Sequence, residues 1–287
     1  MMRRVGKLFP GVCFFEALLR AARLAARGKK HRLAVARFLW NLEPELLQLQ
    51  TELRDGSYRP GACRKFMIHD PKEREISVAP FRDRVVHQAL CGVVAPILER
   101  SAIHHSYACR VGKGTHRAIR QAQRLVRGRR FFLKCDVRQF FASVDHGVLK
   151  MLLRRCLKDD RVLDLCDRII DAGGADALGA CRTGLPIGNL TSQHLANFYL
   201  CGLDHFVLEE LRPSGYLRYM DDFLLCDDDR GRLAGMLREV RGWLANQRSL
   251  RLKEQATLLT RSGAGLPFLG LRIYPGVMRL RRRKARR

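Results

Sequence analysis

The chain has 287 residues, and its 54 lysines and arginines against 28 aspartates and glutamates give a formal net charge of +26 at pH 7. With 47% hydrophobic residues it can still build a core, so the composition indicates a basic globular protein. The electrostatic field of so basic a protein attracts polyanions. Nucleic acid is a better match to this charge than the alternative partner, an anionic membrane surface. No apolar run approaches the ~20 residues of a membrane-spanning helix, so we expect a cytoplasmic protein without a membrane partner.

The ten cysteines favour a reducing compartment. They form no Cys-x-x-Cys pair and have no regular histidine spacing beside them, which argues against zinc. Most of them stand among apolar residues, as Cys135, Cys201 and Cys226 do, and this is typical of reduced core cysteines.

The first sixty residues predict a helical N-terminal extension. Apolar side chains recur at helical spacing over residues 14–27 and 32–53, with charged residues between them. Pro44 falls inside the second pattern, so that helix begins, ends or kinks near Glu43. The basic residues here could bind a phosphate backbone or form a solvated face.

Short extended segments follow at residues 64–69 and 74–78, and the turn between them predicts a hairpin. It carries Lys65, Lys72 and Arg74, and converging cations suit a triphosphate. Residues 81–99 then predict a helix that Pro96 disturbs in its last turn. The glycines around Lys113 could let backbone N–H groups approach phosphate, but the segment lacks the spacing of a P-loop.

The aromatic and apolar run at residues 131–137 predicts a buried strand that ends in Asp136. A buried carboxylate is costly unless it is paired or bound to a metal. Phe140 and Phe141 are expected on a turn, before a helix over residues 147–157. A turn with two glycines and a proline at residues 184–193 should open a helix over 194–211, whose N-terminus can face an anion or a base pair.

Residues 216–226 carry two adjacent carboxylates, Asp221 and Asp222, between apolar, β-prone runs. Adjacent aspartates disfavour a strand, so the pattern predicts a tight hairpin with an acidic tip. A solvated acidic turn is the alternative. In so basic a protein an acidic tip favours Mg²⁺, and Asp136 on a neighbouring strand would complete the arrangement of a two-metal phosphoryl-transfer site.

Four segments, in this order, resemble the palm motifs of reverse transcriptases. The segments run from Asp136 to Phe141, from Leu185 to Gln193, from Tyr219 to Asp222 and from Leu266 to Gly270. Residues 71–76 and 83–90 are similar to finger motifs of the bacterial group-II-intron-like enzymes, and the whole resemblance covers about residues 8 to 280.

The resemblance implies an α+β right-hand polymerase fold, with an antiparallel palm sheet backed by helices. Fingers would come from residues 61–130, with a contribution from 151–190, and the palm from 131–275. A helical thumb should follow, but after residue 274 only thirteen residues remain, and seven of the last nine are basic. We therefore expect residues 276–287 to be a basic tail and the thumb to be short or missing.

Two positions favour one subclass of the family. Ile187 stands where intron, retron and retroviral enzymes usually have glutamine, and Gln193 stands where they usually have proline after Ser192. Both changes resemble the reverse transcriptases of diversity-generating retroelements, which copy a template RNA into cDNA with frequent errors at adenines. The alternatives are a retron, intron or phage-defence reverse transcriptase, and a catalytically weak RNA-binding scaffold.

The resemblance also implies partners: template RNA, a DNA or RNA primer, dNTPs and a small basic helical accessory variability protein. Two Mg²⁺ ions, or Mn²⁺, would be held by Asp136 and Asp221, with Asp222 and the backbone of Val137 completing the site. Phe141 would be a steric gate under the sugar, and Lys253 is a candidate proton donor to pyrophosphate. The implied nucleotide-binding residues are Lys72, Arg74, Phe141, Ile187, Gly188 and Gln193. The implied nucleic-acid-binding residues are Lys65, Arg110, Lys113, Tyr219 and Met220.

Overall fold

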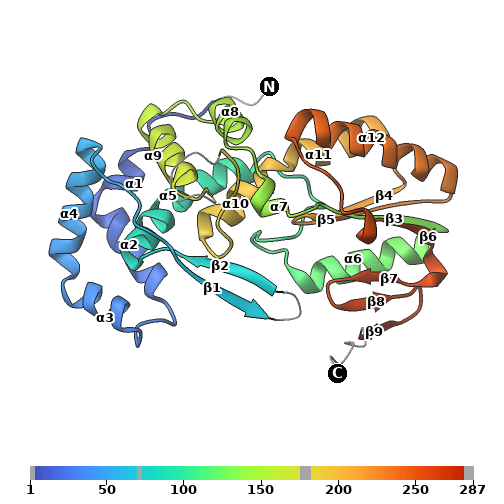
Figure 1. Cartoon of the computed structure of the whole chain (residues 1–287), viewed down its shortest axis with the longest axis horizontal. Coiled ribbons are helices and arrows are strands. Elements are labelled where there is room, and N and C mark those ends of the chain that lie inside the picture. Colours follow the sequence, from blue (N-terminus) through green and yellow to red (C-terminus); the bar gives the residue numbers. More distant parts are fainter. Residues whose placement is uncertain (1–3, 70–72, 175–181, 281–287) are drawn as a thin grey trace. The chain divides into compact units, whose positions relative to one another are not determined.

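The computed structural model describes residues 4–69, 73–174 and 182–280, and the chain forms two compact units (Figure 1). The first unit contains Met1–Ser101 and Val144–Ala196, and the second contains Ala102–Ser143 and Asn197–Arg287. The chain therefore enters each unit twice. The predicted boundaries of fingers and palm stay a prediction.

The first unit is mainly helical. Its centre is α5 (Phe81–Glu99), which buries eleven side chains and runs through Pro96 without ending there. α2 packs along α5. The other helices are α1 (Pro10–Cys13), α2 (Phe15–Ala26), α3 (Leu33–Trp40), α4 (Leu42–Asp55), α8 (His146–Cys156), α9 (Asp160–Asp171) and α10 (Leu190–Tyr199), of which α10 continues into the second unit.

Two predicted helices differ from the observed ones. The helix predicted over residues 32–53 is divided at Asn41 into α3 and α4. Pro44 lies in the first turn of α4, where its missing N–H removes no hydrogen bond. The helix predicted over 194–211 begins four residues earlier, at Leu190, and is divided into α10, α11 (Cys201–His205) and a π-helical segment at Phe206–Leu211.

The predicted hairpin is confirmed as β1 (Arg64–His69) paired antiparallel with β2 (Glu73–Val78). The Ser77 N–H donates to the carbonyl of Ile187 at 2.8 Å, so the 184–189 turn is held against β2. Gly188 is required there because its φ is +118° and a Cβ would lie 2.9 Å from the Ser77 oxygen. Lys72, which stands between β1 and β2 in the sequence, lies outside the described residues.

The second unit is built on an antiparallel sheet in the order β4-β5-β3-β6. Figure 1 shows α12 on one side of this sheet and α6 on the other. A separate antiparallel sheet of β7, β8 and β9 lies near α6. The bounds are α6 (Thr115–Gly128), β3 (Phe131–Asp136), α7 (Phe140–Ser143), β4 (Gly215–Tyr219), β5 (Asp222–Asp227), α12 (Arg230–Arg248), β6 (Leu258–Arg261), β7 (Leu266–Phe268), β8 (Leu271–Ile273) and β9 (Met278–Leu280), with 3₁₀ turns at Glu254–Ala256 and Ser262–Ala264.

The core of this unit lies between α6 and the sheet. Ala118, Ala122 and Val126 recur at four-residue spacing, so small side chains form the inner stripe of α6 and let the helix approach the strands closely. They meet Phe132 from β3 and Leu224 from β5. The predicted turn at Phe140 and Phe141 is instead the short helix α7, in which Phe140 is buried and Phe141 is half-buried.

All nine cysteines within the described residues are free, and seven of them are buried. Burial raises the pKa of the Cys135 and Cys226 thiols to about 12. This agrees with the prediction of reduced core cysteines. None of the helices in the described ranges combines the length and the apolar character that crossing a bilayer requires.

The conformation of Gly265, in the turn before β7, leads to a prediction about stability. Gly265 has a φ of +83°, and a Cβ there would lie 2.6 Å from the Tyr274 ring. Gly265→Ala should therefore lower the free energy of unfolding by about 2 kcal/mol or more. Gly263→Ala, in the same loop but with open space around its Cβ, should be neutral or stabilising by up to about 1 kcal/mol. Urea unfolding followed by circular dichroism compares the two, and equal effects would contradict the assignment of strain to Gly265.

Candidate active site

Three carboxylates gather at one end of the four-stranded sheet. Asp136 is the last residue of β3, and it lies directly opposite Asp222, the first residue of β5. The N–H of Val137 donates to the carbonyl of Asp221 at 3.2 Å, which ties the end of β3 to the hairpin tip. The predicted hairpin is thus observed, with Met220 and Asp221 as its two-residue turn between the paired residues Tyr219 and Asp222.

The turn holds its backbone in an unfavourable conformation. Met220 has a φ of +58°, in the left-handed region that costs a residue with a side chain roughly 1–2 kcal/mol. Such a conformation persists only where surrounding contacts fix it. Here the Arg218 Nη1 donates to the Met220 carbonyl at 3.0 Å on one side, and the Val137 contact holds Asp221 on the other. The turn that carries Asp221 is therefore held by two hydrogen bonds, one from Arg218 within β4 and one from Val137 just after β3.

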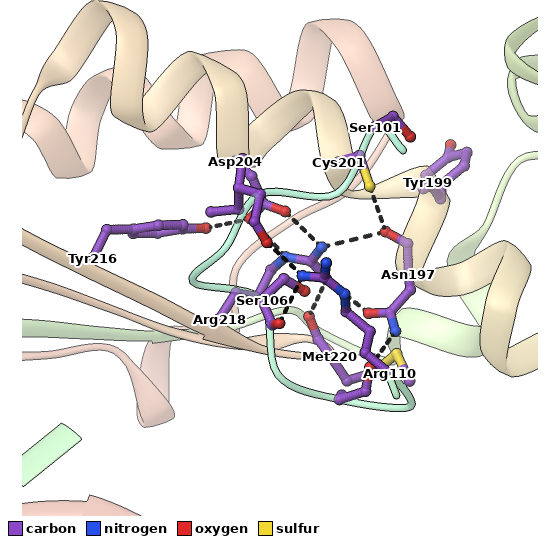
Figure 2. A network of polar contacts seen from close by, with 12 residues as sticks. Ser101, Ser106, Arg110, Asn197, Tyr199, Cys201, Asp204, Tyr216, Arg218 and Met220 are labelled. Atoms are coloured by element: carbon purple, nitrogen blue, oxygen red, sulfur yellow. Dashed lines mark hydrogen bonds and ion pairs between the residues drawn. The ribbon is translucent and has the colours of Figure 1, made fainter. Parts of the chain in front are cut away.

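Arg218 is the centre of a buried polar network (Figure 2). Its Nε and Nη2 donate to the two carboxylate oxygens of Asp204 on α11, at 2.7 and 2.6 Å, and both side chains are fully buried. The Nη1 also donates to the side-chain oxygen of Asn197 at 3.1 Å, and the Tyr216 hydroxyl donates to Asp204 at 2.7 Å. Burial alone would lower the pKa of Arg218, but the charge of Asp204 raises it above its usual value, so the guanidinium stays charged.

The loop before α6 supports the network through its backbone. The Arg218 N–H donates to the His105 carbonyl, and the Tyr107 N–H donates to the Arg218 carbonyl, both at 2.9 Å. Asn197 donates to the Ala108 carbonyl at 2.6 Å. Arg110, which the sequence predicts as a nucleic-acid contact, is half-buried and donates to the carbonyls of Ile103 and Ser106. Its guanidinium therefore has a role inside the loop.

The second carboxylate of the hairpin is paired within the sheet. Lys134 on β3 is buried and lies 2.9 Å from Asp222. Burial raises the pKa of Asp222 to about 7, Lys134 opposes the rise, and the charges of Asp136 and Asp221 add to it. The charges of Asp136 and Asp221 therefore both act on Asp222, and Lys134 offsets the charge of Asp222.

The donor set fits a hard divalent cation. Among the described residues, no group of three or more His, Cys, Asp or Glu side chains is arranged to hold a metal by itself. Mg²⁺ in nucleotide-transferring enzymes is commonly bound by one or two carboxylates, with water and substrate phosphate as the other ligands. Asp136 and Asp221, both half-buried, supply that number of carboxylates at the end of the sheet.

Other predicted residues lie around this end of the sheet. The Lys253 N–H donates to the Asp136 carbonyl at 2.8 Å, which places Lys253 beside the end of β3. Phe141 packs edge to face on Phe140, with the ring centroids 5.6 Å apart. The Tyr219 hydroxyl lies 2.9 Å from the Thr115 hydroxyl at the start of α6. The roles assigned to these residues stay predictions.

The remaining predicted residues belong to the first unit. Arg74 is exposed on β2, and exposed Lys65 on β1 pairs with Glu75 at 3.1 Å. Ile187 is half-buried beside β2, through the contact of its carbonyl with Ser77. Gln193 lies in the first turn of α10 and is half-buried.

The sequence analysis missed Arg218, Asp204 and Lys134. Each carried a signal, because Arg218 and Lys134 interrupt apolar strands and a buried cation requires a partner. The sequence did not identify the partner. Asp204 lies fourteen positions from Arg218, and Asp222 lies 88 positions from Lys134, so only the fold brings them together.

A family model described as reverse transcriptase (RNA-dependent DNA polymerase) matches residues 68–273, which is more than half of the chain. The chain belongs to the reverse transcriptase family. The prediction that it is an enzyme of the class of RNA-directed DNA polymerases is thereby confirmed.

Two curated proteins illustrate the relationships of this reverse transcriptase. Protein YkfC of Escherichia coli (strain K12) is 28% identical over 274 residues, which are 81% of this chain and 72% of that protein. The group II intron-encoded protein LtrA of Lactococcus lactis subsp. cremoris is 28% identical over 172 residues, which are 58% of this chain and 29% of LtrA.

Solved telomerases share the fold of this reverse transcriptase. Telomerase from Candida albicans, determined with a fragment of telomeric RNA, matches with a TM-score of 0.58 and 13% identity over 79% of this chain. Apo telomerase from Candida tropicalis matches with a TM-score of 0.59 and 11% identity over 78% of this chain. The chain spans about half of each telomerase chain, 47% and 49%. The predicted α+β polymerase fold with an antiparallel sheet is confirmed.

The buried ion pair makes a second stability prediction. Asp204→Asn leaves the buried Arg218 without its counter-charge, so the free energy of unfolding should fall by about 3–5 kcal/mol. Glu254→Gln is the control, because it breaks the pair with Arg241, whose side chains are 42% and 65% exposed, and such a pair contributes about 1 kcal/mol or less. Urea unfolding measures both. A small effect of Asp204→Asn, comparable to the control, would show that the network does not stabilise the unit.

Proposed function

We propose that this reverse transcriptase extends a primer on a template RNA with an active site formed by Asp136, Asp221 and Asp222. The observation that carries the proposal is the register of the sheet, in which Asp136 faces Asp222 while Asp221 occupies the adjacent turn. An acidic site on a chain with a net charge of +26 suits a reaction whose substrates are polyanions. The proposed substrates are dNTPs and a DNA or RNA primer.

In this mechanism Asp136 and Asp221 would hold the metal, and the backbone carbonyl of Val137 would be a further ligand. Two Mg²⁺ ions held there would supply the positive charge that activates the attacking hydroxyl and stabilises the leaving group. Asp222 would support the site formed by Asp136 and Asp221 without holding the metal as firmly, because its carboxylate is engaged in an ion pair with Lys134. Arg218 orients Asp221 through the Met220 carbonyl, so the carboxylate is in place before substrate arrives.

The proposal assigns three further roles. Lys253, anchored by its N–H to the Asp136 carbonyl, would give a proton to the departing pyrophosphate. Phe141 would contact the sugar and exclude a 2′-hydroxyl. Lys72 and Arg74 remain the proposed ligands of the triphosphate, because cations at the end of a hairpin can bind several phosphate oxygens.

The metal site makes a prediction about activity. Asp221→Asn removes one anionic ligand with little change in shape, so primer extension on an RNA template should fall by at least about a thousandfold, the scale of ~4 kcal/mol of lost stabilisation. Binding of the same template should change by less than about twofold, because the basic surface is retained.

The matched control for this experiment is Asp228→Asn. Asp228 is an exposed aspartate just after β5, paired with Arg129 at 2.9 Å. Its amide variant should extend primers at the rate of the unmodified chain. Substantial extension by Asp221→Asn with Mg²⁺ would remove Asp221 from the site, and a chain that binds RNA but never extends a primer would favour the scaffold alternative.

The second part of the proposal is that the enzyme is error-prone and belongs to a diversity-generating retroelement. Ile187 and Gln193 support it, because both differ from the residues usual in other subclasses. Ile187 is held against β2 by the Ser77 hydrogen bond, and its neighbour Gly188 fits there only without a side chain. The backbone of Ile187 is therefore held in place, and its alkyl side chain could make no hydrogen bond to a nucleotide. A small basic helical accessory protein is the partner proposed for this role.

Ile187→Gln tests this role. A side chain that can hydrogen-bond should raise discrimination against misincorporation opposite template adenines by ~1 kcal/mol, or about fivefold, the scale of one net hydrogen bond. Ile187→Val is the control, because it keeps an apolar side chain of similar volume and should leave the error spectrum unchanged. Sequencing cDNA made on one adenine-rich RNA compares the three proteins. Equal adenine-specific error rates for Ile187→Gln and the unmodified chain would exclude Ile187 from fidelity.

The alternative function is that of an intron-encoded enzyme. The similarity to LtrA favours it, although the match covers 29% of that protein. An enzyme of that kind should copy adenines as accurately as other bases. A low and uniform error rate in the same sequencing experiment would support this alternative over the retroelement proposal.

A further inference from the structure

Residues 102–135 carry a concentrated positive charge. These 34 residues include nine lysines and arginines and no aspartate or glutamate. The basic residues are Arg110, Lys113, Arg117, Arg120, Arg124, Arg127, Arg129, Arg130 and Lys134. Of these residues, Lys134 pairs with Asp222 in the candidate active site, and Arg110 donates to carbonyls within its own loop. The other seven have no role in that site.

The fold places three of these arginines in a row. Arg117, Arg120 and Arg124 follow one another at three- and four-residue spacing on α6, so they lie along one face of the helix. All three are exposed, while Ala118, Ala122 and Val126 face the sheet. No carboxylate in the described part of the chain pairs with them. Like charges at this spacing destabilise a helix, and a bound polyanion would relieve that repulsion.

The row borders a groove. The groove has a volume of about 270 Å³ and is lined by these arginines together with His104, Tyr107 and Lys113. Lys113 donates to the His104 carbonyl at 2.8 Å and lies 5.1 Å from the centre of the Tyr107 ring. The Tyr107 ring is only 5% exposed and belongs to the core, so it does not offer a stacking surface to a base. A positively charged groove that follows the backbone is a feature with which proteins bind a nucleic-acid strand without reading its sequence.

The position of α6 connects the row to the active site. Thr115, at its first turn, contacts the hydroxyl of Tyr219, which begins the catalytic turn. Near its other end, Arg127 donates to the Pro275 carbonyl at 3.0 Å, just before β9. The eleven residues from Arg117 to Arg127 extend about 15 Å along the helix axis, and one strand of a duplex advances about 3.4 Å along the duplex axis per phosphate. The basic face is therefore long enough for about four consecutive phosphates, which is longer than one triphosphate.

We propose that the outer face of α6, with the groove beside it, binds the sugar-phosphate backbone of the nucleic acid that is held at the catalytic hairpin. The proposal rests on the proposed function, because it takes the nucleic acid to be an RNA–DNA primer–template hybrid. The contacts are electrostatic and independent of sequence. Their effect is to hold the hybrid in line with Asp136 and Asp221 while the primer end reacts.

The test compares two triple variants of the full chain. The first variant combines Arg117→Gln, Arg120→Gln and Arg124→Gln, and glutamine keeps a helix propensity close to that of arginine. The matched control combines Arg230→Gln, Arg238→Gln and Arg241→Gln on α12, where three exposed arginines are removed from the helix on the other side of the sheet. Binding of a labelled RNA–DNA hybrid is measured by fluorescence anisotropy between 50 and 300 mM salt, about the range in which such contacts are resolved.

The α6 variant should lose affinity by at least about tenfold at the lowest salt, and the slope of log K against log salt should fall by about two to three, at about 0.9 per phosphate contact. In the α12 control variant, the affinity and the salt slope should both change by much less. A third variant, with lysine at the same three positions on α6, should recover most of the slope, because lysine also binds phosphate as a point charge. Circular dichroism melting checks that each variant is folded.

Three results would overturn the proposal. The two glutamine variants losing affinity equally would assign binding to net charge alone. A lysine variant as weak as the glutamine variant would exclude a charge-based contact. If the α6 glutamine variant bound the hybrid as tightly as the unmodified chain but had a higher KM for dNTP, the groove would be a site for a free triphosphate. Because binding is measured without synthesis, a chain that binds the hybrid through α6 but never extends it would contradict the proposed function and leave this proposal standing.

Discussion

The fully buried ion pair between Arg218 and Asp204 is the interaction on which the active site depends. It joins β4 to α11, and through the Met220 carbonyl it helps to fix the turn that carries Asp221. Because both charges are shielded from water, neither can be removed without leaving the other unpaired. The pair therefore links two separate segments of the chain. Because Arg218 contacts both Asp204 on α11 and the carbonyl of Met220, the position of α11 influences the position of the Asp221 carboxylate.

Lys134 plays a complementary part on the other face of the same sheet. Alternation along the strands places Lys134 and Asp222 on one face, and Arg218 with Tyr216 on the other. Lys134 neutralises one carboxylate, while Arg218 positions the next one without neutralising it. The sheet thus carries three acidic residues at its end at a tolerable electrostatic cost, with the net negative charge left on Asp136 and Asp221.

Local patterns in the sequence predicted the elements of the site well. The apolar run ending in Asp136 and the acidic step at Asp221 were sufficient to predict a strand and a hairpin, because each signal lies within a few residues. Long-range partners were not predictable, since nothing near Arg218 in the sequence identifies Asp204. Similarly, Gln193 was expected before a helix and lies inside α10, because the helix begins at Leu190. Asn189, a residue type that is common just before a helix, is the signal for that start which the prediction did not use. The resemblance of the motifs to those of reverse transcriptases was sufficient to predict the fold. The contacts between distant segments could be seen only in the structure.

The buried thiol of Cys135 has a consequence for the choice of metal. Cys135 immediately precedes Asp136, so a thiolate there would offer a soft ligand next to a hard one. Alternation along β3 directs its side chain to the opposite face, and burial raises its pKa to about 12, so the thiol stays protonated at neutral pH. Zinc and copper(I) bind thiolates strongly and hard carboxylate sites less selectively. With its sulfur protonated and turned away, the end of β3 offers a carboxylate and no thiolate to the proposed metal site, which would disfavour capture of that site by thiophilic metals.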